Sequence, residues 1–147
     1  PIGEGDVEPM TWAMAEMARG LPAPQVASSL AGSHTFTRRL AAWWEEGFDL
    51  LLTPTLAQPP ARLGEFDAKP DDPLWGMKRC QGYVGFTGQF NLSGQPAISL
   101  PLFWNREGLP IGVQLVAAFG REDLLIRVAA QLEEARPWDG RRPQVHA

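Results

Sequence analysis

The side chains that could act as nucleophiles are five serines and one cysteine, and no serine lies in a catalytic motif. A nucleophile elbow has the pattern Gly-x-Ser-x-Gly, but Ser93 has Asn91 where the motif needs glycine. The chain has two histidines, His34 and His146, and neither has a motif around it. A Ser–His–Asp triad is therefore not expected. The other serines are Ser28, Ser29, Ser33 and Ser99.

Cys80 follows Lys78 and Arg79, two cations that lower a thiol pKa when they also approach it in space. A small, half-buried thiol without a catalytic role is nevertheless the favoured interpretation. Because it is the only cysteine, an internal disulfide is impossible, which favours a reducing compartment. A zinc site built from Cys80, His34 and His146 would lack a fourth ligand and a recognisable spacing, so no metal is expected.

Glycines at positions 82, 85 and 88 form a Gly-x-x-Gly-x-x-Gly repeat. This is neither the dinucleotide fingerprint nor a Walker A loop, and no cofactor is expected. Glycine lets a backbone approach another backbone or a ligand closely. We therefore predict close packing beside a pocket.

Adjacent carboxylates recur along the chain but do not form an acid/base dyad. Neighbouring residues on a helix point in different directions, so solvated surfaces and helix ends explain these pairs better. They are Glu45-Glu46, Asp71-Asp72, Glu122-Asp123 and Glu133-Glu134. From the residues alone, no catalytic constellation is predicted.

The bulk composition limits the class of protein. The 147 residues are 44% hydrophobic and 20% charged, as in one globular domain, and the net charge of −4 argues against a nucleic-acid partner. No apolar run is long enough to span a membrane and no signal peptide is recognisable, so a cytoplasmic protein is expected. The chain begins at Pro1 and not at Met, which suggests a truncated, processed or proteolytic piece.

The first half of the chain predicts helices followed by a strand. A helix should begin at Pro9 and end at Gly20, and a short helix should cover about 24–30. A third helix should follow Ser33 as its N-cap and end at Gly47. Residues 48–53 are nearly all apolar, which is typical of a strand buried on both faces of a parallel sheet.

The second half predicts a long loop, a hairpin and a helix. Residues 54–73 are rich in proline and glycine, and a loop of that length is usually functional or a lid. Segments 96–101 and 111–117 read as antiparallel strands joined by a turn. A helix should begin near Asp123 and end at Pro137, and residues 137–147 read as a tail. The fold class is therefore α/β, with too few strands for a self-sufficient sheet.

Two blocks carry a family resemblance: 91–101, Asn-Leu-Ser-Gly-Gln-Pro-Ala-Ile-Ser-Leu-Pro, and 108–117, Gly-Leu-Pro-Ile-Gly-Val-Gln-Leu-Val-Ala. Together with the helix at 121–134 and the Phe-Asp-Leu-Leu-Leu-Thr-Pro-Thr block at 48–55, they resemble the C-terminal part of the amidase-signature family. The resemblance covers about 9–136. It implies that residues 1–147 are the C-terminal part of an amidase-signature fold, a mixed sheet covered by helices that is incomplete alone.

The resemblance also implies a reaction, hydrolysis of carboxamide C–N bonds by a serine, a bridging serine in a cis peptide and a lysine. In the family these residues lie in a glycine- and serine-rich segment of the N-terminal half, which this sequence does not contain. The chain has only two lysines, Lys69 and Lys78, and its Ser28-Ser29 pair lacks flanking glycines. No residue here is therefore assigned a catalytic role, and the chain alone is expected to be inactive.

What the resemblance leaves to this chain is part of the substrate site. Thr55 follows a strand end, and the segment around 83–90 is glycine-rich and aromatic, as a pocket wall is. We predict that Thr55, Cys80, Phe86 and Thr87 line the site of a small-molecule amide; core packing is an equal alternative for Phe86. The N-terminal part of the same enzyme is the expected partner.

Two other functions remain open from the sequence. The chain could be a non-catalytic structural or interaction module whose sheet edge pairs with a partner or a second copy. It could also be part of an amidotransferase A-type subunit. A sheet without its other strands should expose apolar edges, so a homodimer, segment swapping or aggregation is expected of the chain alone.

Overall fold

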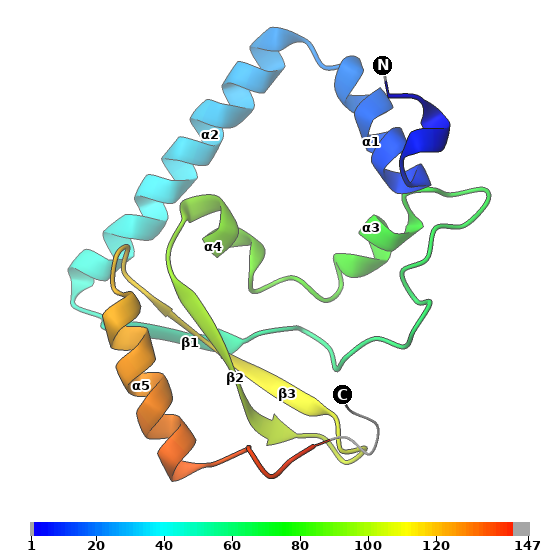
Figure 1. Cartoon of the computed structure of the whole chain (residues 1–147). Coiled ribbons are helices and arrows are strands. Elements are labelled where there is room, and N and C mark those ends of the chain that lie inside the picture. The colour runs from blue at the N-terminus through cyan, green and yellow to red at the C-terminus, as the bar shows by residue number, and fades with distance from the viewer. Residues whose placement is uncertain (1, 143–147) are drawn as a thin grey trace.

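The structure is a computed structural model that describes residues 2–142, and Figure 1 shows its arrangement. Two short 3-10 turns, η1 (Glu4–Asp6) and η2 (Trp43–Glu46), accompany the regular elements. These are α1 (Pro9–Arg19), α2 (Ala23–Ala42), β1 (Leu50–Pro54), α3 (Trp75–Cys80), α4 (Gly88–Ser93), β2 (Ala97–Trp104), β3 (Pro110–Ala117) and α5 (Glu122–Ala135). The predicted α/β class is confirmed.

The three strands form one antiparallel sheet in the order β1-β3-β2. The hairpin of β2 and β3 confirms the sequence prediction. The parallel setting predicted for residues 48–53 is wrong, because β1 runs antiparallel to β3 and Leu52 is 65% exposed. An apolar run indicates that a strand needs burial, but it does not contain the direction or number of its neighbours.

One face of the sheet packs on α5 and forms the core. Strand side chains alternate between faces, so Leu100, Leu102, Leu115 and Ala117 share the apolar side. They pack against α5 residues Leu125, Val128, Ala129 and Leu132, which recur at helical spacing. The acidic residues Glu122 and Asp123 in the first turn of α5 favour its start there.

Helix α2 is longer than the sequence indicated. It runs unbroken through Ser33, so the prediction of Ser33 as an N-cap is wrong. The Ser33 hydroxyl instead donates to the Ser29 carbonyl at 3.0 Å, one turn back, which lets serine occupy a helix interior. Gly47 does follow the last turn, at φ +95°, and its N–H bonds the Trp44 carbonyl at 3.2 Å, as expected of a C-cap glycine.

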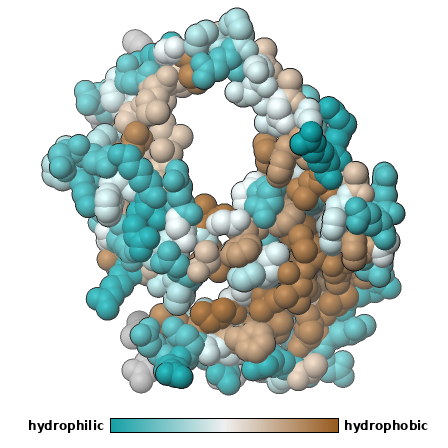
Figure 2. All heavy atoms as spheres, turned by 180° about the vertical axis from the view of Figure 1, so that it is seen from behind, coloured by the Kyte–Doolittle hydropathy of each residue, from teal (hydrophilic) through white to brown (hydrophobic). Residues whose placement is uncertain are grey.

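Helices α1 and α2 extend away from the sheet, and no residue of either is buried. Only the lower part of α2 approaches α4, and Figures 1 and 2 show an open ring bounded by α1, α2 and the α3–α4 region. Figure 2 also shows much apolar surface in the lower part of the molecule. The exposed apolar side chains on these two helices are Met14, Met17, Val26, Leu30 and Phe36. Within residues 2–142, no helix is both long and apolar enough to cross a membrane.

The packing of α5 gives a matched pair of variants. Leu125 is 3% exposed, while its neighbour Ile126 is 65% exposed. We expect Leu125→Ala to lower the free energy of unfolding by about 2–5 kcal/mol because it leaves a cavity under the sheet. Ile126→Ala should change it by about 0.5 kcal/mol or less. Urea unfolding of both variants measures the difference, and equal losses would contradict the packing described.

Candidate functional site

The face of the sheet opposite α5 carries polar side chains, and the candidate site lies there. The register places Thr53 opposite Gln114, and Gln114 opposite Ser99. Thr55, the residue after β1, lies two residues beyond Thr53, and Gly112 lies two residues before Gln114, so both belong to the same face. The signal in the sequence was the presence of polar residues inside apolar strands, at Ser99 and Gln114, which sequence reasoning did not select.

Gln114 links the sheet to the glycine-rich segment. Its side chain is 4% exposed, and its Nε2 donates to Thr53 Oγ1 at 3.0 Å and to the Phe86 carbonyl at 2.8 Å. A buried amide that lost these acceptors would cost about 1–3 kcal/mol. The two bonds therefore fix the position of the backbone at Phe86 relative to β1 and β3.

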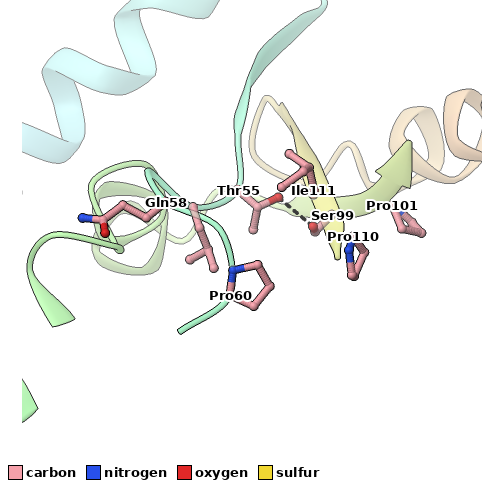
Figure 3. Close-up of a pocket in the computed structure, with 9 residues that line it drawn as sticks. Thr55, Gln58, Pro60, Ser99, Pro101, Pro110 and Ile111 are labelled. Atoms are coloured by element: carbon pink, nitrogen blue, oxygen red, sulfur yellow. Dashed lines mark hydrogen bonds between the residues drawn. The ribbon is translucent and has the colours of Figure 1, made fainter. Parts of the chain in front are cut away.

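Thr55 and Ser99 form a hydroxyl pair at the end of this face. Their Oγ atoms lie 2.6 Å apart (Figure 3). The Thr55 N–H donates to the Gly112 carbonyl at 3.0 Å. Gly112 lies directly against the pair. A Cβ added there would lie 2.7 Å from both hydroxyl oxygens, closer than real Cβ atoms approach anything. Glycine is required here because it lets the polar groups of neighbouring strands converge.

A pocket of about 290 Å³ opens beside the hydroxyl pair (Figure 3). The lining combines two hydroxyls with prolines and aliphatic side chains, and it contains no charged residue. Its members are Thr55, Leu56, Gln58, Pro60, Ser99, Pro101, Pro110, Ile111 and Gly112. This arrangement can bind a small neutral molecule through hydrogen bonds at one end and apolar contact elsewhere.

The long loop after β1 is held in place near its start and at its middle. Near the pocket, Ala57 N–H donates to the Tyr83 carbonyl at 2.9 Å, and Gln58 Nε2 donates to the Gly82 carbonyl at 3.0 Å. Further along, the indole of Trp75 donates to the Glu65 carbonyl at 3.1 Å. These hydrogen bonds hold the loop against α3 and the glycine-rich segment at 82–88, and they position the pocket wall at 56–60.

Glu65, Tyr83 and Arg79 form a charged cluster under this loop. The Tyr83 hydroxyl donates to Glu65 Oε1 at 2.9 Å, and Arg79 forms an ion pair with Glu65. The pKa of Glu65 is lowered, first by the hydrogen bond from Tyr83 and also by the charge of Arg79. The pKa of Tyr83, which is 6% exposed, is raised by burial and by its bond to Glu65. Glu65 is therefore held ionised and Tyr83 protonated.

Of the four residues predicted to bind substrate, the pocket described above is lined by one. Thr55 lines the pocket described above. Cys80 ends α3, where its carbonyl accepts from Tyr83 N–H at 2.8 Å, and Thr87 precedes α4, where its carbonyl accepts from Phe90 N–H at 3.1 Å. The Phe86 carbonyl is held by Gln114. The roles of Cys80, Phe86 and Thr87 in binding stay predictions.

Neither lysine lies in a serine–lysine arrangement. Lys69 Nζ lies 3.0 Å from the centre of the Trp75 ring, and Lys78 Nζ binds both oxygens of Asp72 at 2.9 and 2.8 Å. That bond lowers the pKa of Asp72. In the described part of the chain, no three His, Cys, Asp or Glu side chains gather as a metal site.

Comparison with known proteins identifies the family. The family model described as Amidase matches residues 5–126. The chain belongs to the amidase family. It is 42% identical, over 99% of its length, to the 6-aminohexanoate-cyclic-dimer hydrolase of Paenarthrobacter ureafaciens, and it covers 30% of that relative, in its C-terminal part.

Further comparisons agree with this assignment. The solved structure of 6-aminohexanoate cyclic dimer hydrolase superposes with a TM-score of 0.84 at 40% identity, over 98% of this chain and 31% of that one. The A-type subunit of the glutamyl-tRNA(Gln) amidotransferase of a Picosynechococcus species is 40% identical over 66% of this chain and 19% of its own length. The predicted family and fold are therefore confirmed, and the amidase chain spans about a third or less of these relatives.

Gly112 gives a direct test of the hydroxyl pair. We expect Gly112→Ala to lower the free energy of unfolding by about 1–3 kcal/mol, because the added methyl forces Thr55 and Ser99 apart. Gly85→Ala is the matched control, since a Cβ there meets nothing within 4 Å and its backbone needs no left-handed φ. It should leave stability unchanged or raise it slightly. Thermal unfolding of both variants measures this, and a neutral Gly112→Ala would contradict the close approach.

The Glu65 cluster gives a pH-dependent prediction. The folded-state pKa of Glu65 lies below the unfolded value of about 4.3, so its stabilisation is complete above that pH and is lost as pH falls through the folded value. Tyr83→Phe removes the largest cause and should raise the Glu65 pKa toward its ordinary value. The stability difference between the wild type and Tyr83→Phe should therefore be larger at pH 7 than at pH 3.

Carboxyl titration by NMR measures the Glu65 pKa directly. Asp72 is the internal control, because its lowered pKa depends first on Lys78 and not on Tyr83. A Glu65 pKa that does not rise in Tyr83→Phe, or an equal shift of Asp72, would refute this account of the cluster.

Proposed function

We propose that this chain is the C-terminal part of an amidase that hydrolyses carboxamide C–N bonds through a serine, a cis-peptide serine and a lysine. These catalytic residues would lie in the N-terminal part of the protein, outside this chain, and the chain alone would be inactive. The observation that carries the proposal is 42% identity to a hydrolase over nearly the whole of this chain, which spans only 30% of that relative.

The side chains of this chain support the proposal that the catalytic residues lie outside it. In the proposed mechanism the serine is activated by a base within hydrogen-bond reach. Lys69 covers an aromatic ring and Lys78 is paired with Asp72, while the adjacent serines Ser28 and Ser29 lie exposed on α2. These observations support the proposal that the nucleophile and its base lie elsewhere in the protein.

The contribution of this chain would be a wall of the substrate site. Thr55 lines the pocket, and Gln114 holds the Phe86 backbone beside the same sheet face. Thr87 follows Phe86 directly, and Cys80 precedes the segment at the end of α3. We propose that these four residues, Thr55, Cys80, Phe86 and Thr87, face the amide substrate in the whole enzyme.

The relatives' names suggest two versions of the reaction. The hydrolase likeness favours an amide of an aliphatic amino acid as substrate, as in the 6-aminohexanoate cyclic dimer. The likeness to the A-type subunit of glutamyl-tRNA(Gln) amidotransferase, over 66% of the chain, supports a second candidate, a role within an amidotransferase. Co-purification of a partner subunit would distinguish the second from the first. A cytoplasmic location fits both.

The exposed helices support the same proposal. Apolar residues of α1 and α2, among them Met17 and Leu30, are 61% and 58% exposed. Burial of such side chains is favourable by about 25 cal/mol per Å². We propose that the N-terminal part of the protein covers them, and that without it a second copy of the chain would compete for the same surface.

A fluorophosphonate probe, which labels activated serines, tests the proposal. We expect no labelling of the 147-residue chain, and labelling together with amide hydrolysis by a longer protein that includes the preceding segment. Labelling of the short chain would show that the claim of inactivity is wrong. A longer protein that neither takes the probe nor hydrolyses an aliphatic amide would refute the amidase proposal itself.

A further inference from the structure

We propose that the Thr55–Ser99 hydroxyl pair and the pocket beside it bind the carbonyl oxygen of a small, neutral aliphatic carboxamide. The inference deepens the proposed function, on which it rests for the class of ligand. It adds Ser99 and Gly112 to the binding residues and assigns a specific role to Thr55. The hydrogen bonding, the lining and the size of the pocket each support this role.

The hydroxyl pair has one hydrogen left to donate. Each hydroxyl has one donor and two acceptor positions. At 2.6 Å, one of the two oxygens donates to the other, so the second hydroxyl keeps its own hydrogen. Over residues 2–142, neither oxygen has another hydrogen-bond partner. The free hydrogen matches a carbonyl oxygen, and the hydroxyl that donates it is strengthened because it already accepts a bond.

The walls of the pocket select an uncharged ligand. Pro60, Pro101 and Pro110 have no N–H to offer and hold fixed backbone angles, while Leu56 and Ile111 add apolar surface. The amide nitrogen of Gln58 is already bound to the Gly82 carbonyl. The lining holds no charged side chain that could pair with a charged ligand, whereas the hydroxyl pair offers a donor to a neutral carbonyl.

The size of the pocket and the position of Gly112 select a small ligand. A volume of about 290 Å³ lies just below the range of roughly 300–1,000 Å³ for ligand pockets. Gly112 keeps this space open, because a Cβ there would lie 3.0 Å from Thr55 Cβ and closer still to both hydroxyls. An unbranched chain of a few carbons with one carboxamide fits these limits.

The test is a titration of the 147-residue chain with hexanamide, followed by backbone-amide NMR. We expect saturable shifts at Thr55, Ser99 and Gly112. The Thr55→Val/Ser99→Ala double variant should bind about 3- to 10-fold more weakly, the equivalent of one neutral hydrogen bond. Each single variant should lose less, because the remaining hydroxyl can still donate. Hexanoate and hexylammonium, which have a similar length but carry charge, should bind more weakly than hexanamide.

A matched control is available on α2. Ser33 and Thr35 bond only helix carbonyls one turn back, at 3.0 Å each, or a neighbouring arginine, and they lie outside the pocket. The Ser33→Ala/Thr35→Val variant should bind hexanamide as the wild type does. Thermal unfolding of each variant confirms that it is folded before titration.

Three results would overturn the inference: no saturable binding to the wild type, equal binding by the pocket double variant, or charged ligands binding as well as hexanamide. Hydrolysis by the longer protein is measured separately. If the longer protein cleaves amides while the pocket variants bind normally, only the inference fails. If hexanamide binds as expected but the longer protein has no amidase activity, only the proposed function fails.

Discussion

The central strand β3 is the constraint on which the rest of the structure depends, because it must satisfy two opposite environments. Leu115 and Ala117 point to α5 and complete the apolar core. Gln114, next to Leu115 in the strand, points to the other face and donates to both Thr53 and Phe86. Because side chains alternate between the two faces of β3, this one strand contributes to both the core and the candidate site. A shift of its register by one residue would exchange the two environments.

This two-sided strand explains why the candidate site is built from short polar residues. The sheet face opposite α5 carries polar side chains where those of neighbouring strands can form hydrogen bonds with one another, as Thr55 and Ser99 do. The two hydroxyls satisfy part of each other's hydrogen bonding, although Ser99 is exposed and Thr55 is half-buried. They also leave room, through Gly112, for a pocket at the end of the face. Stability and a binding surface thus arise from the same hydrogen bonds.

The individual helices and strands were largely predictable from the sequence. How elements far apart in the sequence pair and pack with one another was not. Pro9, Gly47 and the spacing from Leu125 to Leu132 mark helix ends and a helix face, because capping and periodicity act over a few residues. The antiparallel partner of β1 and the unbroken α2 depend on contacts elsewhere. The same holds for the candidate site. The sequence predicts Thr55 because it follows the end of a strand, but Ser99 and Gly112 lie beside it only because of the strand register.

The helices α1 and α2 show how the partial span of the chain affects its energetics. A helix with no buried residue gains little from tertiary packing, and isolated helices shorter than about 12–15 residues are marginal in water. Helix α1 has 11 residues, and it lines shallow hollows together with Met77 of α3 and with residues of the 66–73 loop. The sheet and α5, by contrast, share a continuous core. The sparse packing of α1 is what the proposal expects of a helix covered by other parts of an amidase, while the sheet that carries the candidate site has a core of its own with α5.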